Sequence, residues 1–344
     1  MKRPVLGVTM GDPAGVGPEI IARAAAEPGV RAACRPVVIG AAATMREAVA
    51  LVGGRQALHA VSRVADCRWA EGTMEVLDLG NVDMATLPRC EVSAAAGRAA
   101  YEYIERAVSL AQAGDIDAIV TAPVNKEALA AAGVQHSGHT EILAQLSRTR
   151  DFAMLLMGKE LKVIHVTTHV SLRRVPDLVT RERVLKTIRL AQRTLEGLGQ
   201  PHGRIAVAGL NPHAGEDGLF GDEEQQQIMP AIEAARAEGL NVTGPLPADT
   251  LFSRARGGEF DIVVAMYHDQ GHIPVKTLGF EYDETTKKWT GLSGVNVTVG
   301  LPFLRVSVDH GTAFDRAWKG VANHESMVEA FDVATRMITS SAAP

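Results

Sequence analysis

Three histidines, His169, His213 and His268, each follow a run of residues that is typical of a β-strand. They lie in the polar motifs TTH at 167–169, NPHAGE at 211–216 and YHDQGH at 267–272. Neutral imidazoles from separate strand ends suit a catalytic divalent metal ion, because three protein ligands leave coordination positions open for a substrate. Each histidine alone is more often structural. Their occurrence together in three dense motifs predicts a metal-dependent enzyme, with His165 and His272 in supporting or structural roles.

The segments that must position these histidines alternate between short β-branched runs and longer amphipathic runs. This alternation is typical of a largely parallel sheet with helices on its faces. We expect strands at residues 5–9, 36–40, 74–79, 117–122, 161–168, 204–209, 261–266, 295–299 and 304–308. The clearest helices are residues 93–113, 180–198 and 222–238.

The chain contains no low-complexity linker and no evident internal repeat, so its domain boundaries are soft. Junctions are expected near 122–125 and 300–302, where proline and glycine interrupt the pattern. Residues 1–123 and 300–344 are therefore predicted to form a first α/β lobe. Residues 124–299 are predicted to form a second lobe, which carries most of the polar motifs.

The bulk composition excludes several classes of protein. The 344 residues are 46% hydrophobic and 22% charged, as in ordinary globular proteins, and a net charge of −5 gives no reason to expect nucleic acid or membrane partners. Cys34, Cys67 and Cys90 form no CxxC pair and suggest free thiols. With no long apolar run and no signal-peptide pattern, a cytoplasmic location is expected.

The first strand leads into a glycine-rich loop, GDPAGVGPE at 11–19, followed by a helical pattern. The glycines permit tight turning, and the amides at the helix start suit an anionic group. The loop is not GxGxxG, so the usual dinucleotide fingerprint is absent.

With these motifs in place, the whole chain resembles the 4-hydroxythreonine-4-phosphate dehydrogenase family. Nine blocks in family order carry the resemblance: GDPAGVGPE at 11–19, TAPVNK at 121–126, SGHTE at 137–141, TTH at 167–169, GLNPHAGE at 209–216, GPLPADT at 244–250, MYHDQG at 266–271, GVN at 294–296 and SVDHGTA at 307–313. The resemblance implies a two-lobed α/β/α sandwich of the isocitrate/isopropylmalate dehydrogenase type, with the active site in the interlobe cleft and at the interface of a homodimer.

The family's cofactors would be NAD and one divalent metal ion, which we expect to be zinc, magnesium, cobalt or manganese. The family's metal ligands fall on His169, His213 and His268, the same residues that the motifs indicate. No residue of this chain is assigned to the NAD site.

Contacts with a phosphorylated substrate fall, by resemblance, on His139, Thr140, Lys276, Asn296 and Arg305. Guanidinium and ammonium groups suit phosphate and carboxylate recognition. Lys276 and Arg305 could instead be solvated surface charges, but their apolar neighbours in HIPVK and PFLRV make that less favourable. Thr140 could instead be only a helix cap.

The implied reaction is oxidative decarboxylation: hydride leaves the carbon of a hydroxyl acidified by the metal ion, and the β-keto acid loses carbon dioxide. Asp249 and Lys276 are the candidates for the base that takes the hydroxyl proton. A cap at the start of the following helix is an equally good explanation of Asp249.

Two departures from the biosynthetic members bear on the substrate. One is the residue pair His272-Ile273. The other is an insertion at 280–293, which is expected to form a polar hairpin around 283–288, with the Trp289 side chain folding back towards the cleft. The HIPVK form resembles catabolic relatives that act on 4-phospho-D-threonate or 4-phospho-D-erythronate, and we favour that branch. The insertion could also be a surface feature without a role.

Four alternatives stay open on the sequence. The first is the vitamin B6 biosynthetic 4-phosphohydroxy-L-threonine dehydrogenase itself, and a less favoured one is an aromatic cis-dihydrodiol dehydrogenase, which needs no phosphate contacts. The third is a metal-dependent hydrolase or lyase, because three histidines alone do not specify hydride transfer. The fourth is a binding or regulatory protein that keeps the fold but has lost catalysis; it predicts erosion of the ligands or anion contacts, which the matched positions do not show.

Overall fold

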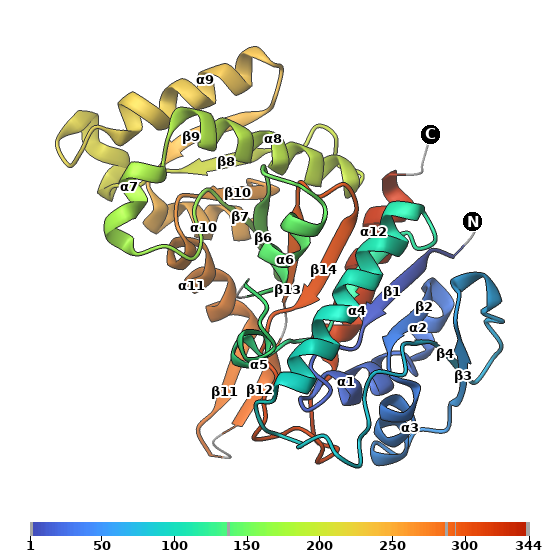
Figure 1. The fold of residues 1–344 in the computed structure, drawn as a ribbon. Helices are drawn as coiled ribbons and strands as arrows, with labels where there is room; N and C mark the ends of the chain where they lie inside the picture. The colour runs from blue at the N-terminus through green and yellow to red at the C-terminus, as the bar shows by residue number, and fades with distance from the viewer. Residues whose placement is uncertain (1–2, 136–137, 286–287, 293, 342–344) are drawn as a thin grey trace. The chain divides into compact units, whose positions relative to one another are not determined.

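The computed structural model describes residues 3–135, 138–285, 288–292 and 294–341. It shows a mixed α/β fold in which helices pack on both faces of parallel strands (Figure 1), as the alternating pattern predicted. The chain divides into two compact units, of which unit 1 contains Met1–Arg150 and Leu301–Thr339, and unit 2 has Asp151–Gly300 as its main segment. No helix in the described part is long and apolar enough to span a membrane.

Unit 1 contains six parallel strands in the order β3-β4-β2-β1-β5-β14. The strands are β1 (Val5–Thr9), β2 (Arg35–Gly40), β3 (Ala57–Val61), β4 (Thr73–Asp78), β5 (Ala118–Thr121) and β14 (Leu304–Val308). Its helices are α1 (Gly17–Ala24), α2 (Pro28–Ala33), α3 (Ala42–Leu51), η1 (Val64–Asp66), α4 (Ala94–Ala113), α5 (Lys126–Ala131), α6 (His139–Leu146) and α12 (Glu325–Ser341).

The main-sheet strands of unit 2 run in the order β13-β6-β7-β10-β8-β9, with β6 antiparallel to both of its neighbours and the others parallel. The strands are β6 (Ala153–Met157), β7 (Lys162–His165), β8 (Ile205–Ala208), β9 (Val242–Leu246), β10 (Ile262–Ala265) and β13 (Val295–Val299). The helical segments are η2 (Leu172–Arg174), α7 (Val175–Leu178), α8 (Arg181–Gly197), η3 (Pro212–Gly218), η4 (Glu224–Ile228), α9 (Met229–Ala237), α10 (Ala248–Arg256) and α11 (His268–Gly279).

The predicted helices begin and end where their capping residues indicate. Ser93 Oγ accepts a hydrogen bond from Ala96 N at 3.1 Å, and Gly114 ends α4 with φ 76°. Thr180 Oγ1 likewise accepts from Arg183 N at the start of α8. The third predicted helix is α9 preceded by the π-helical turn η4.

The first boundary between the units differs from the expected one. The sequence analysis assigned residues 124–299 to the second lobe, whereas residues 124–150 belong to unit 1. The reason is that α5 and α6 pack against α4. At Gly97 the approach of α4 and α5 is so close that a Cβ would overlap the Ala128 carbonyl group.

The insertion forms the antiparallel pair β11 (Phe280–Asp283) and β12 (Lys288–Leu292), which confirms the predicted hairpin. The side chain of Trp289 lies outside the described residues, so its predicted position stays a prediction. Cys34, Cys67 and Cys90 are free thiols, as expected.

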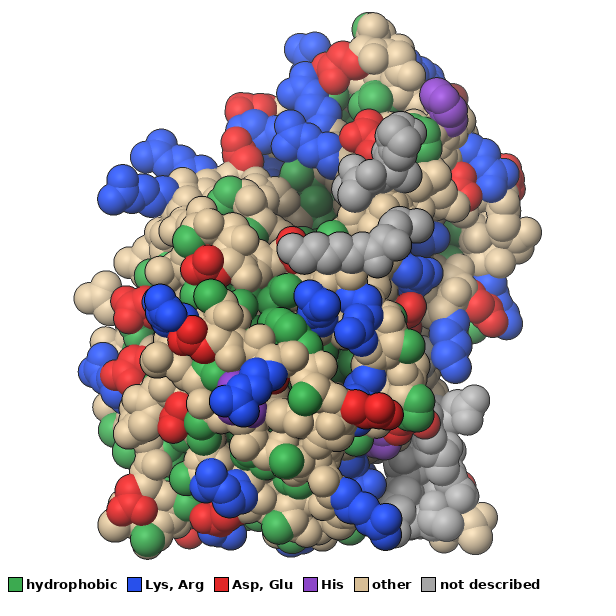
Figure 2. Space-filling model, turned by 90° about the vertical axis from the view of Figure 1, so that its right-hand side faces the viewer, with side chains coloured by type: hydrophobic (Ala, Val, Ile, Leu, Met, Phe, Trp, Pro, Cys, Tyr) green, Lys and Arg blue, Asp and Glu red, His purple; other side chains and the backbone are tan. Residues whose placement is uncertain are grey.

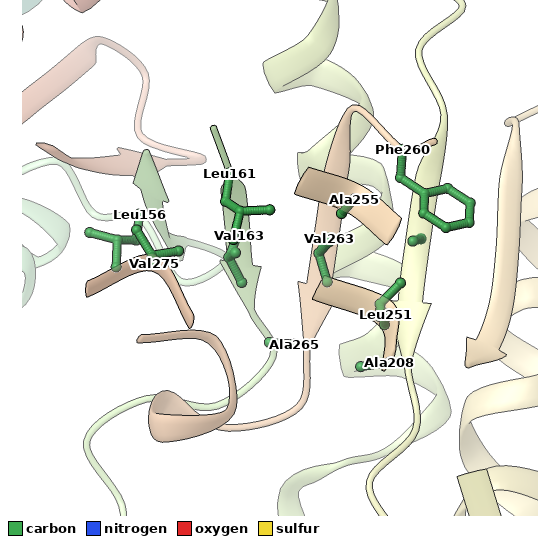
Figure 3. Close-up of a cluster of buried hydrophobic side chains, with 11 residues drawn as sticks. Leu156, Leu161, Val163, Ala208, Leu251, Ala255, Phe260, Val263, Ala265 and Val275 are labelled. Atoms are coloured by element: carbon green, nitrogen blue, oxygen red, sulfur yellow. The ribbon is translucent and has the colours of Figure 1, made fainter. Parts of the chain in front are cut away.

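The core of unit 2 fixes α10 and α11 against the sheet (Figure 3). Its buried residues come from β6, β7, β8, β10, these two helices and the segments just before β7 and β10: Leu156, Leu161, Val163, Ala206, Ala208, Leu251, Ala255, Phe260, Val263, Ala265 and Val275. Each large aliphatic side chain contributes roughly 1.5–3 kcal/mol when fully buried. This packing gives the first residues of both helices defined positions at the carboxyl end of the sheet.

Candidate active site

The three predicted metal ligands of unit 2 follow neighbouring parallel strands. His169 follows β7, His268 follows β10 and His213 follows β8, and these strands are adjacent in the order β7-β10-β8. The carboxyl ends of parallel strands meet at one edge of the sheet, which is where ligands bind in open α/β folds. Thr167 joins two of the loops, because its N and its Oγ1 both donate to Met266 O, at 3.1 and 2.8 Å.

His268 is the first residue of α11 and has an oriented ring. Its Nδ1 lies 2.7 Å from Asp269 Oδ1, and this bond lowers the pKa of the Asp269 carboxyl. The arrangement leaves Nε2 as the nitrogen for a metal ion, since ligating histidines usually bond a carboxylate through the other nitrogen. The ring of His169 lies 5.6 Å from the ring of His268, centroid to centroid.

His165 and His272 form a layer beneath His268. The His272 ring stacks on the His268 ring with centroids 3.7 Å apart, and His272 Nδ1 lies 3.2 Å from His165 Nε2. Burial lowers the pKa of His272 to about 3 and that of His165 to about 4. Both rings are therefore neutral at physiological pH. Gly271 makes the approach possible, because a Cβ there would collide with His165 and Val163.

His213 lies on a turn with an unusual backbone. Residues 213–217 all have positive φ, although only Gly215 of the five is a glycine. Glu224, which is buried, holds the start of this turn: its Oε1 accepts hydrogen bonds from Leu210 N and Asn211 N, both at 2.7 Å. The His213 ring lies beside Phe220, with centroids 6.1 Å apart.

The donor set has the chemistry that a divalent metal requires, namely imidazoles with a carboxylate behind one of them. Within the described part of this single chain, however, no three His, Cys, Asp or Glu side chains gather closely enough to hold an ion. The structure brings His169 and His268 near each other and leaves His213 on the adjacent turn. The three-histidine site therefore stays a prediction.

Lys276 lies on the same face of α11 as His268 and His272, because the three residues are spaced by four. This face lines an open cavity of about 600 Å³ together with Thr277 and Phe280. Lys276 Nζ lies 5.2 Å from the centre of the Phe280 ring.

The two remaining predicted residues of unit 2 lie on different elements. Asp249 is an exposed residue in the first turn of α10, whose N-cap position is Pro247, so Asp249 is not the helix cap. A carboxylate there faces the positive end of the helix dipole. Asn296 is half-buried on β13, paired in register with Leu156 of β6.

Unit 1 gathers three of the sequence blocks in the same way. The GDPAGVGPE, TAPVNK and SVDHGTA loops follow β1, β5 and β14, which are adjacent parallel strands. Asp12 N donates to Pro123 O at 2.9 Å, and Val16 N donates to Thr312 O at 3.0 Å. Gly11 has φ 73°, and a Cβ there would overlap the Pro123 carbonyl group.

Arg305 is buried on β14 and donates from Nη2 to Thr121 Oγ1 at 2.7 Å. Burial lowers its pKa to about 9, and Glu141 partly offsets this effect. The pKa of His139 is held well below its usual range by burial and by the charge of Arg305. His139 Nε2 is buried, with no hydrogen-bond partner among the described residues.

A buried guanidinium and a neutral imidazole therefore lie near each other in unit 1, and a guanidinium is a group that suits anion binding. Thr140 is half-buried and is the second residue of α6, after the cap residue Gly138, so it is not the cap.

Two buried carboxyl groups were missed by the sequence analysis. Asp12 Oδ1 accepts from Ala14 N at 2.8 Å, and burial raises the pKa of Asp12 to about 6. Its place directly after a strand, in a glycine-rich loop, was the available signal. Glu224 gave no such signal, because its partners lie in a loop more than ten residues earlier.

Comparison with known proteins agrees with these motifs. The model of the pyridoxal phosphate biosynthetic protein PdxA family matches residues 32–334. A D-threonate 4-phosphate dehydrogenase from Cupriavidus necator is 50% identical over 98% of both chains, and one from Salmonella typhimurium is 49% identical over 98% of this chain and 100% of the relative.

Among solved structures, a 4-hydroxythreonine-4-phosphate dehydrogenase from Burkholderia phymatum is 49% identical, with a TM-score of 0.85 over 98% of this chain and 99% of that chain. The resemblance suggested by the nine sequence blocks is thus confirmed. With a family model that matches most of its length and relatives about half identical to it, the chain belongs to the PdxA family and is a dehydrogenase of that family.

Proposed function

We propose that this dehydrogenase oxidises the 3-hydroxyl of D-threonate 4-phosphate and that the resulting β-keto acid loses carbon dioxide. The observation that carries the proposal is the identity of 49–50% to two relatives with that name over nearly the whole chain. The two departures from the biosynthetic pattern, His272-Ile273 and the β11–β12 hairpin, support the same branch.

We further propose NAD and one divalent metal ion as cofactors, with His169, His213 and His268 as the metal ligands. When bound, these cofactors would acidify the substrate hydroxyl and accept its hydride. The Asp269 carboxylate would keep the His268 proton on Nδ1, so that Nε2 stays a lone-pair donor. The neutral, stacked His272 ring supports His268 without adding charge beside the ion.

Recognition of the phosphate or carboxylate is proposed for Arg305 and His139, with Thr140, Lys276 and Asn296 as further contacts. A buried guanidinium held by Thr121 is fixed before the anion arrives, so little rotamer entropy is lost on binding. Lys276 and Asp249 are the proposed groups for taking the hydroxyl proton. The position of Lys276 Nζ on the cavity-lining face with His268 supports Lys276 in this role.

A homodimer with its active site at the interface is part of the proposal. Large apolar side chains are exposed beside each metal motif: Leu172 after His169, Leu219 after His213 and Ile273 beside His272 are between 63% and 71% exposed. Exposed apolar groups around a functional site are typical of a surface that another chain covers.

The test is an NADH-absorbance assay on metal-loaded protein, comparing kcat/KM for 4-phospho-D-threonate, 4-phospho-D-erythronate and 4-phosphohydroxy-L-threonine. We expect at least tenfold preference for 4-phospho-D-threonate, about 1.4 kcal/mol in transition-state binding. The second candidate is the biosynthetic activity, which the name of the Burkholderia phymatum structure favours. A preference for the threonine derivative would establish it instead. Absence of NADH formation with all three would refute the proposed dehydrogenase substrates.

A further inference from the structure

A second cavity lies in unit 1, at the strand ends opposite to the motif loops. It has a volume of about 490 Å³ and is lined by residues at the amino ends of β2 and β4, among them Arg35 and Thr73. The Gly11 loop follows the carboxyl end of β1, which is parallel to β2. A five-residue strand spans about 17 Å, so the cavity is separate from the candidate substrate contacts of this unit.

Three guanidinium groups line this cavity, those of Arg3, Arg31 and Arg35. None of them forms an ion pair with a carboxylate among the described residues, whereas the neighbouring Arg63 pairs with Asp66 at 2.8 Å. The Nε atom of Arg35 is buried and has no hydrogen-bond partner among the described residues. A buried donor without a partner is unfavourable, and a bound acceptor would satisfy it.

The carboxylates that line the cavity do not neutralise this charge. Glu75 is buried and already bonded: its Oε2 lies 2.7 Å from His59 Nδ1, and its Oε1 accepts from Arg68 N and Trp69 N at 3.0 and 2.8 Å. Glu71 is exposed to solvent. Three arginines against two carboxylates leave the cavity lining with a net positive charge.

Trp69 forms part of the wall in a conformation that must be held in place. Its φ is 57°, a left-handed value that has an energetic cost for a non-glycine residue. The hydrogen bond from Trp69 N to Glu75 offsets this cost, and the Arg35 guanidinium lies 5.7 Å from the ring centre. Basic side chains beside a strip of apolar ones are visible in the middle of the face drawn in Figure 2.

We propose that this cavity binds a phosphate-bearing small molecule of about the size of a mononucleotide. The guanidiniums of Arg3, Arg31 and Arg35 bind the phosphate, and the Trp69 ring and the Met74 side chain contact the remaining part. Arginine forks match phosphate geometry, and the volume lies within the range of small-molecule sites, roughly 300–1,000 Å³.

The test uses ¹⁹F NMR of protein labelled with 5-fluorotryptophan. The chain contains three tryptophans, so the spectrum is simple. The Trp69 resonance is assigned by its loss in Trp69→Phe, and the full chain is titrated with AMP and with adenosine. We expect a saturable shift of the Trp69 resonance by AMP with a Kd of about 1 mM or tighter, and none by adenosine at the same concentrations.

Two single substitutions locate the contact. Arg35→Gln and Arg31→Gln are each expected to weaken AMP binding at least tenfold, while Arg63→Gln, outside the cavity lining, leaves it unchanged. The other two fluorotryptophan resonances report that each variant is folded. Equal shifts with adenosine and AMP, an unchanged Kd in both cavity variants, or no saturable shift of the Trp69 resonance would overturn the proposal.

Discussion

Replacement of Glu224 by alanine is expected to damage the turn that carries His213. Glu224 begins the π-helical turn η4 and is buried, and it accepts three hydrogen bonds: from Leu210 N, from Asn211 N and, at 2.9 Å, from Asn211 Nδ2. The turn that follows holds five consecutive residues in the left-handed region. Without these bonds, less interaction energy offsets the backbone cost of that conformation.

The magnitude follows from the bonds that are lost. A hydrogen bond to a charged acceptor contributes about 1.5–3 kcal/mol, and a buried donor left unpaired costs about 1–3 kcal/mol. Asn211 Nδ2 keeps a second partner, Glu223 Oε2 at 2.7 Å, so its loss is small. Glu224→Ala should therefore lower the free energy of unfolding by about 3–5 kcal/mol. Glu224→Gln retains one oxygen for both amides and should cost about 1 kcal/mol.

The assays are urea unfolding and zinc affinity, the latter by competition with a chromophoric chelator. Because a misplaced ligand support typically costs 10–100-fold in metal affinity, Glu224→Ala should bind zinc about 10–100-fold more weakly. Glu223→Ala is the matched control, since it removes a neighbouring carboxylate but leaves the hydrogen bonds from Leu210 N and Asn211 N to Glu224 in place. If Glu224→Ala binds zinc as tightly as the parent, the link between this carboxylate and His213 is refuted.

Further substitutions test the other groups of the site. Asp269→Asn replaces the charged acceptor of the His268 proton by a neutral amide and should weaken zinc binding about tenfold, measured by the same competition. An unchanged affinity would contradict the ligand role of His268. Arg305→Lys loses the two-pronged guanidinium and should raise KM for the phosphorylated substrate at least tenfold, with kcat less affected. A tenfold loss in kcat with an unchanged KM would contradict anion binding by Arg305. Asp249→Asn should lower kcat far more than it raises KM, and near-normal turnover would remove Asp249 from the mechanism. Burial raises the pKa of Asp12 in the folded protein to about 6, above its ordinary value of 3.8. The stabilising effect of the protonated carboxyl is therefore complete below pH 4 and is lost as the pH rises through 6. Asp12→Asn should therefore gain up to about 3 kcal/mol relative to the parent between pH 4 and 7 in urea unfolding, and a parallel pH dependence of the two proteins would refute this.

Much of the arrangement was predictable, because the strands that carry the site are strongly β-branched and each is followed directly by its polar motif. The order of the strands then brings His169, His268 and His213 to one edge. Three strands escaped prediction for different reasons. β6 is AMLLM, an apolar run without β-branched residues, β9 contains glycine and proline, and β3 is interrupted by His59.

The shape of the His213 turn could not be predicted from its residues. Histidine, alanine and glutamate rarely adopt positive φ, and nothing local favours it here. The conformation depends on a carboxylate that arrives from a later helix, so it is a tertiary effect. The same holds for residues 124–150, whose place in unit 1 depends on the contact of α5 with α4 at Gly97.

The two departures from the biosynthetic sequence pattern converge on one helix face. His272 packs on His268 and lines the cavity, and Phe280, where the inserted hairpin begins, lines it one turn beyond Lys276. The substitution and the insertion are separated by several residues in the sequence, yet both border the groups proposed to act on the substrate. A surface insertion without a role would not need to begin at this face. The convergence makes the hairpin the segment whose replacement would test for a role in the choice of 4-phosphorylated acid.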